Sequence, residues 1–154
     1  MAVSRYASAS ATEEFATVTP GNEDRPDAGH VVQRATLDDA RTDGLRLLEA
    51  ALGYGVFEAD LAGCHDKAGL LDRLARALSF PDRFGGNWDA WFDCLTDLGW
   101  HRPAPGYVLL CRRALGMHRS APEALDTALA IVEDAARVWA DRGVTVRAFV
   151  DLDN

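Results

Sequence analysis

The stretch from residue 80 to residue 100 constrains the fold most, because an apolar helical pattern directly follows a pair of glycines. Gly85 and Gly86 precede Asn87, a residue type that favours the N-cap of a helix. The apolar side chains then recur at the spacing of one helix face: Trp88, Trp91, Phe92, Leu95 and Leu98. This pattern predicts a helix from Asn87 to Leu98 that packs one side against a core.

The far side of the same predicted helix carries three carboxylates. Asp89, Asp93 and Asp97 are spaced four residues apart, so they lie as neighbours along one side of a helix. Carboxylates at this spacing repel one another by roughly 0.2–0.5 kcal/mol per pair, and no Lys or Arg lies between them in the sequence. These three aspartates, here called the acidic ridge, are a candidate binding site. The alternative is a surface helix that simply exposes acidic residues to water.

Strand and helix patterns alternate along the rest of the domain. Strands are expected at residues 31–34, 55–61, 107–111 and 144–151, with the continuous apolar run at 107–111 typical of an interior parallel strand. A helix is expected over 36–52, with Leu45, Leu48 and Leu52 on its apolar face, and another runs up to Ser79. Ser120 and Glu123 have the spacing of a capping box before a long helix that ends at Gly143.

Strands separated by helices predict parallel pairing and right-handed crossovers. The expected fold class is therefore α/β, with a small, mainly parallel sheet of three to four strands and packed helices. Residues 1–29 are rich in small, polar and charged residues and predict a disordered tail. One domain is expected over residues 30–154.

The charge and cysteine content exclude several classes of protein. The chain has 16 basic and 24 acidic residues and a formal charge of −8, which disfavours direct binding to nucleic acid or to anionic membranes and favours a basic partner. Its three cysteines form no CxxC pair, as expected of reduced thiols in a cytoplasm. No apolar leader and no run of ~18 apolar residues is present, so neither export nor membrane insertion is expected.

Enzymatic and metal-binding patterns are weak. The four histidines are scattered outside any HExxH spacing, and neither a GxSxG motif nor a phosphate-binding loop is present. Glycoside hydrolysis needs two carboxylates facing each other across a cleft, and a Mg²⁺ or Ca²⁺ site usually draws ligands from several elements. Cys94 has no base nearby in the sequence. No catalytic residue, metal or cofactor is expected, and an aspartate-dependent hydrolase remains the enzymatic alternative.

The central stretch resembles the motif of the barstar-like family of intracellular ribonuclease inhibitors. The residues that carry the likeness are Phe80, Pro81, Phe84, Gly85, Asn87, Asp89, Ala90, Asp93, Cys94 and Leu95. It extends over residues 54–152, so the extra strand and helix at 30–53 lie outside it. The resemblance implies a barstar-like fold and a protein that plugs the basic active-site cleft of a ribonuclease, with carboxylates standing in for RNA phosphates.

The same resemblance implies which residues bind the partner: Gly85, Gly86, Arg83, Asn87, Asp89, Phe92, Asp93 and Asp97. Asp93 takes the place of the phosphate-mimicking aspartate, Asp89 that of a second acidic contact, and Phe92 that of an interface tryptophan. Arg83 stands where the family has an interface tyrosine, and Arg142 where it has another acidic contact. The implied partner is a basic extracellular-type ribonuclease or a related toxin, bound by a protein that is monomeric when free. An immunity protein for a toxin that is not a ribonuclease, or an acidic protein-binding module, are the alternatives.

Overall fold

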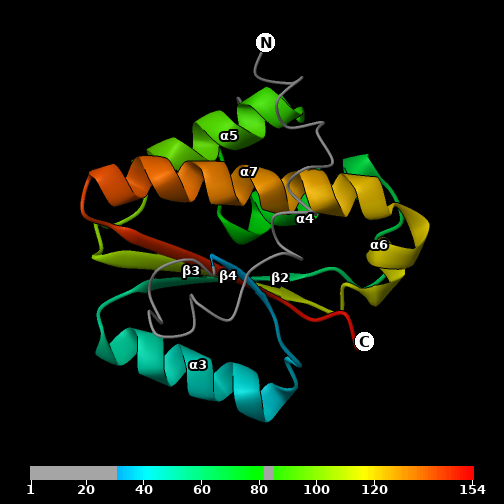
Figure 1. The fold of residues 1–154 in the computed structure, drawn as a ribbon, viewed down its shortest axis with the longest axis horizontal. Coiled ribbons are helices and arrows are strands. Elements are labelled where there is room, and N and C mark those ends of the chain that lie inside the picture. Colours follow the sequence, from blue (N-terminus) through cyan, green and yellow to red (C-terminus); the bar gives the residue numbers. More distant parts are fainter. Residues whose placement is uncertain (1–30, 82–84) are drawn as a thin grey trace, which may run out of the picture.

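Four parallel strands with helices on both faces form the protein, according to a computed structural model that describes residues 31–81 and 85–154 (Figure 1). The sheet has the order β1-β4-β3-β2, and all three strand pairs are parallel. The strands are β1 (Val32–Arg34), β2 (Gly55–Asp60), β3 (Gly106–Arg112) and β4 (Thr145–Val150). The predicted α/β class is confirmed. The predicted tail at residues 1–29 lies outside the described residues.

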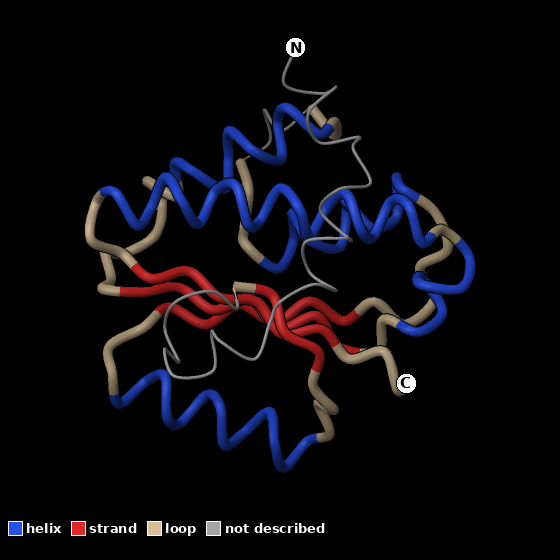
Figure 2. Tube along the Cα trace, in the orientation of Figure 1, coloured by secondary structure: helices blue, strands red, loops and turns tan. Residues whose placement is uncertain are grey.

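The helices and the sheet form three layers, with the sheet in the middle (Figure 2). On one side lies α3 (Asp39–Ala51), and on the other lie α4 (Lys67–Ala77), α5 (Trp88–Asp97) and α7 (Pro122–Asp141), with α5 packed on α7. The short α6 (Leu115–Ser120) joins β3 to α7. Among the described residues, none of the helices is both long enough and apolar enough to cross a membrane.

The core has two parts, one on each face of the sheet, and β3 contributes to both. Its residues Tyr107, Leu109 and Cys111 belong to the larger cluster beneath α4, α5 and α7. Val108 and Leu110 belong to the smaller cluster beneath α3. Because both faces of β3 are buried, its sequence is continuously apolar instead of alternating, as predicted for an interior parallel strand.

The helix α3 starts later than its sequence pattern predicts. The cap is Asp38, whose side chain accepts a hydrogen bond from the backbone N–H of Arg41 at 2.8 Å. Thr36, the expected first residue, instead donates its hydroxyl to the side chain of Asp153. The C-terminal segment therefore engages Thr36 and leaves the capping position to Asp38.

The predicted apolar face of α3 is only partly correct. Leu45 is half-buried against the smaller core cluster, but Leu48 and Leu52 are 57% and 54% exposed. The buried side of the helix instead carries Thr42 and Glu49. Burial raises the pKa of Glu49, and the nearby Arg147 lowers it by a smaller amount.

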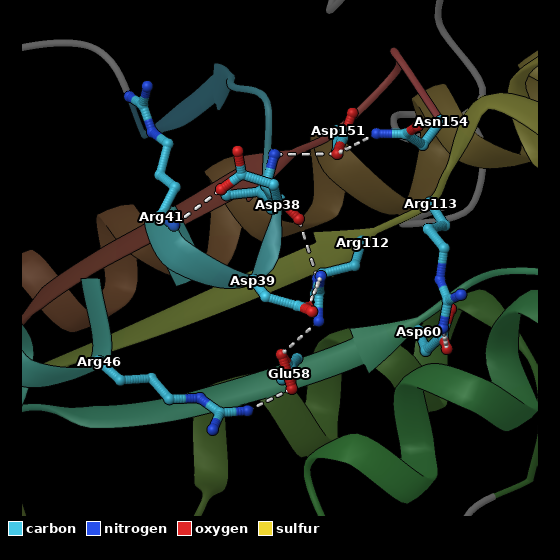
Figure 3. A network of polar contacts seen from close by, with 11 residues as sticks. Asp38, Asp39, Arg41, Arg46, Glu58, Asp60, Arg112, Arg113, Asp151 and Asn154 are labelled. Carbon is cyan, nitrogen blue, oxygen red and sulfur yellow. Dashed lines mark hydrogen bonds and ion pairs between the residues drawn. The ribbon is translucent and has the colours of Figure 1, made fainter. Parts of the chain in front are cut away.

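Ion pairs join α3 to the sheet (Figure 3). Arg112, at the end of β3, pairs with Asp39 at 2.8 Å and with Glu58 of β2 at 3.5 Å. Its Nε also donates to the backbone carbonyl of Leu37 at 3.0 Å. Arg46, in the second turn of α3, pairs with Glu58 as well. These contacts connect the first two turns of α3 to two strands, while Leu48 faces solvent.

The predicted capping box at the start of α7 is wrong. No side chain caps this helix: Ala121 is the N-cap residue and Pro122 the first residue. Ser120 is the last residue of α6, a helix that the sequence analysis did not predict. A capping serine needs an extended backbone, and Ser120 is already helical, so it cannot serve.

Candidate functional site

The entry to α5 has the geometry that its sequence predicts. Asn87 caps the helix, and its side-chain oxygen accepts a hydrogen bond from the Ala90 N–H at 2.8 Å. Gly86 has a φ of 71°, in the left-handed region where a side chain would be strained. Gly85, Gly86 and Asn87 are all exposed. The start of the helix is therefore well formed and accessible from solvent.

The acidic ridge lies on the solvent side of α5. Asp89, Asp93 and Asp97 are all exposed. Within residues 31–81 and 85–154, no cation forms an ion pair with the carboxylate of Asp89 or of Asp93. Asp89 in the first turn is favoured by the helix dipole, whereas Asp97 in the last turn is opposed by it. The ridge thus presents negative charge that the described part of the chain does not neutralise at Asp89 and Asp93.

Two tryptophans hold the opposite side of α5 against α7. Trp91 of α5 is 0% exposed, and its indole N–H donates to the carbonyl of Ala128 in α7 at 3.2 Å. Trp139 of α7 donates its indole N–H to the carbonyl of Leu95 in α5 at 2.8 Å. Each helix therefore supplies one donor to the backbone of the other, which restricts both sliding and rotation of α5.

The C-terminal end of α5 is held by Arg142, the residue that follows α7. Its guanidinium donates to the carbonyl of Thr96 at 2.8 Å and lies 4.8 Å from the centre of the Trp139 ring. The last carbonyls of a helix have no partner within the helix, so Arg142 and Trp139 satisfy two that would otherwise need water. A cation here is also favoured by the helix dipole. From the sequence, Arg142 is expected only to stand where the family has an acidic contact. No residue near it in the sequence reveals that its guanidinium reaches α5.

Two other predicted site residues remain, Phe92 and Arg83, and only Phe92 belongs to the described part of the chain. Phe92 is partly buried and packs against the main core, so only part of its ring is accessible. Arg83 lies outside the described residues. Trp88, which sequence reasoning assigned to the packed side, is also only partly buried, and the ammonium of Lys67 lies 5.1 Å from the centre of its ring. Lys67 is a neighbour of the site that its sequence position did not reveal.

An aromatic cluster anchors the segments on either side of the site. The carbonyl of Leu78, at the end of α4, accepts the Trp100 indole N–H at 3.0 Å and lies 2.5 Å from Nε2 of His101. Phe80 lies between Trp91 and Trp100, with ring centres 5.5 and 5.7 Å apart. The segment that follows α4 and the segment that follows α5 are therefore held together beside α5.

The chemistry that the described residues offer at this site is that of exposed carboxylates. No group of three or more His, Cys, Asp or Glu that could hold a metal ion occurs among residues 31–81 and 85–154. Burial raises the pKa of the Cys111 thiol to about 12, so a thiolate nucleophile is not available there. What the ridge can supply is a row of exposed carboxylates, able to accept hydrogen bonds from cationic groups.

Comparison with known proteins adds one finding. A family model described as Barstar (barnase inhibitor) matches residues 54–151. The match includes every residue predicted to bind the partner, and it leaves out β1 and α3. No curated protein matches the chain.

Proposed function

The chain belongs to the barstar (barnase inhibitor) family, and from this premise we propose that it inhibits a ribonuclease by placing the acidic ridge of α5 in the basic active-site cleft. In this proposal the carboxylates of Asp89 and Asp93 take the positions of RNA phosphates. The loop of Gly85, Gly86 and Asn87 forms the adjoining part of the contact. The exposed part of Phe92 and the carboxylate of Asp97 complete it.

One observation carries the proposal: Asp89 and Asp93 are exposed, without an ion-pair partner among the described residues, on a helix whose other side is firmly held. A carboxylate that is not engaged within its own chain can form a charge-assisted hydrogen bond with an arginine or lysine of the partner. Because α5 is fixed on α7, little conformational entropy is lost when the complex forms.

The overall charge supports the same proposal. With a formal charge of −8, the chain should attract a basic enzyme over distances longer than a direct contact. Screening limits this attraction to about 8 Å at physiological ionic strength. Added salt should therefore slow association more than it speeds dissociation.

The experiment titrates the purified protein into barnase and measures residual ribonuclease activity. Asp93→Ala should weaken inhibition by at least about tenfold, equivalent to ~1.4 kcal/mol, and Asp93→Asn should do the same if charge is what matters. The matched control is Asp43→Ala, which also removes an exposed carboxylate, but from α3, on the other side of the sheet.

The outcomes distinguish a direct contact of the ridge with the enzyme from an effect of the net charge of the protein. If Asp43→Ala weakened inhibition as much as Asp93→Ala, the ridge would act only through the net charge and not as a contact surface. If the unmodified protein left barnase fully active, inhibition of this enzyme would be rejected. Turnover of a phosphoester or glycoside by the purified protein, lost in Asp93→Ala, would support the hydrolase alternative instead.

A further inference from the structure

Both ends of α5 lie next to a cation that rests on a tryptophan ring. The Lys67 ammonium lies 5.1 Å from the ring centre of Trp88, the first residue of α5. The Arg142 guanidinium lies 4.8 Å from the ring centre of Trp139 and donates to Thr96, the residue before the last of α5. Both Lys67 and Arg142 are exposed. The helix is therefore acidic along its ridge and has positive charge at each end.

These cations keep their full charge for a partner. A tryptophan ring attracts a cation through its quadrupole and a carbonyl through its dipole, and neither contact neutralises the charge. The same contacts hold each cation in place, so less side-chain entropy is lost when a second molecule binds there. A partner that covers α5 from end to end would meet two positioned cations as well as the aspartates.

We infer that Lys67 and Arg142 bias which ribonucleases the ridge accepts, by favouring clefts with carboxylates or other hydrogen-bond acceptors at the rim over clefts that are basic there. The inference rests on the proposed function. The middle of such a cleft is basic, opposite Asp89 and Asp93. A cleft that is basic up to its rim would face Lys67 and Arg142 with like charges, and juxtaposed like charges are an effective means of rejecting a wrong partner.

Three charge reversals test the inference, with barnase as the probe and with association rates measured at low and high salt. Lys67→Glu and Arg142→Glu reverse the two cations. Arg41→Glu is the control, because it makes the same change in net charge at an exposed residue of α3, on the other side of the sheet. Lys67→Glu should not destabilise the fold, since a negative charge in the first turn of α4 is favoured by the helix dipole.

At low salt, Lys67→Glu and Arg142→Glu should each change the association rate by about three- to tenfold more than Arg41→Glu does, and the excess should shrink as salt is added. An increase means that the rim of barnase is basic opposite these residues, and a decrease means that it is acidic. Arg142→Lys, which keeps the charge, should behave like the unmodified protein.

Two results would contradict the inference in distinguishable ways. If barnase binds and the two reversals change the rate no more than Arg41→Glu does, the cations lie outside the contact and the inference alone fails. If neither the unmodified protein nor any variant binds barnase, including the double variant Lys67→Glu/Arg142→Glu, the proposed inhibition of this enzyme fails and the inference fails with it.

Discussion

Replacing Trp139 with phenylalanine should loosen α5 from α7 and weaken inhibition at the same time. The indole N–H of Trp139 donates to the Leu95 carbonyl at 2.8 Å, and its ring carries the guanidinium of Arg142 at 4.8 Å. Phenylalanine keeps an aromatic ring but has no donor, so the Leu95 carbonyl loses its partner. The variant therefore removes the hydrogen bond while keeping most of the buried apolar surface.

The cost can be worked out from these contacts. Leaving a buried carbonyl without a partner costs about 1–3 kcal/mol. The smaller ring leaves a void that adds roughly 1 kcal/mol. Since Trp139 is only 9% exposed, water cannot fully replace the lost donor. We expect the free energy of unfolding to fall by ~2–4 kcal/mol, a large share of the ~5–15 kcal/mol typical of a domain.

Urea unfolding followed by tryptophan fluorescence measures the stability change, and inhibition of barnase measures the functional one. A loosened helix should raise the dissociation rate more than it lowers the association rate, weakening inhibition by about tenfold. The matched control is Tyr107→Phe, which keeps the ring and removes the hydroxyl that donates to the Arg102 carbonyl at 3.4 Å, outside the α5–α7 contact. If stability changed by less than ~0.5 kcal/mol, or if Tyr107→Phe weakened inhibition equally, the proposed role of Trp139 would be refuted.

Three further predictions concern stability. Burial opposes ionisation of Asp151, yet hydrogen bonds from Leu37 N–H, Asp153 N–H and the Asn154 side chain outweigh it and lower its pKa. Its carboxylate should therefore stabilise the fold above a pH of about 4, the usual range of an unfolded aspartate, and this contribution should disappear as the pH falls through the lowered pKa. Acid unfolding of Asp151→Asn should lack that contribution, and an unchanged acid midpoint would contradict the assignment. Leu45→Ala should lower the free energy of unfolding by about 2 kcal/mol and Leu48→Ala by less than ~0.5 kcal/mol in urea titrations, because only Leu45 packs on the sheet; equal effects would contradict the observed rotation of α3. We propose that deletion of residues 1–29 leaves the melting temperature nearly unchanged, whereas deletion through residue 53 lowers it markedly by uncovering Val108 and Leu110, and equal melting temperatures would make α3 dispensable.

The sequence by itself determined the features that depend on neighbours within a few residues. The spacing of apolar residues predicted α5, and Asn87 after two glycines predicted its cap. The four-residue spacing of the aspartates predicted that they share one side of that helix. The continuous apolar run at 107–111 predicted an interior strand and, with the alternation of strands and helices, the parallel α/β class. Helix and strand periods are local properties of the backbone, so they can be read from residue spacing.

Only the tertiary structure decided the contacts that join distant parts of the chain. Trp139 and Arg142 reach α5 from 44 and 46 residues away, and no local pattern marks them as its partners. In α3, Leu48 and Leu52 face solvent although their spacing predicts burial, and Arg46 and Asp39 of this helix form ion pairs with β2 and β3. Ser120 does not cap α7, because it is the last residue of α6 and its backbone is helical, whereas a capping residue has an extended backbone. In each case the outcome depends on which surface the topology brings opposite a residue, and residue spacing does not contain that information.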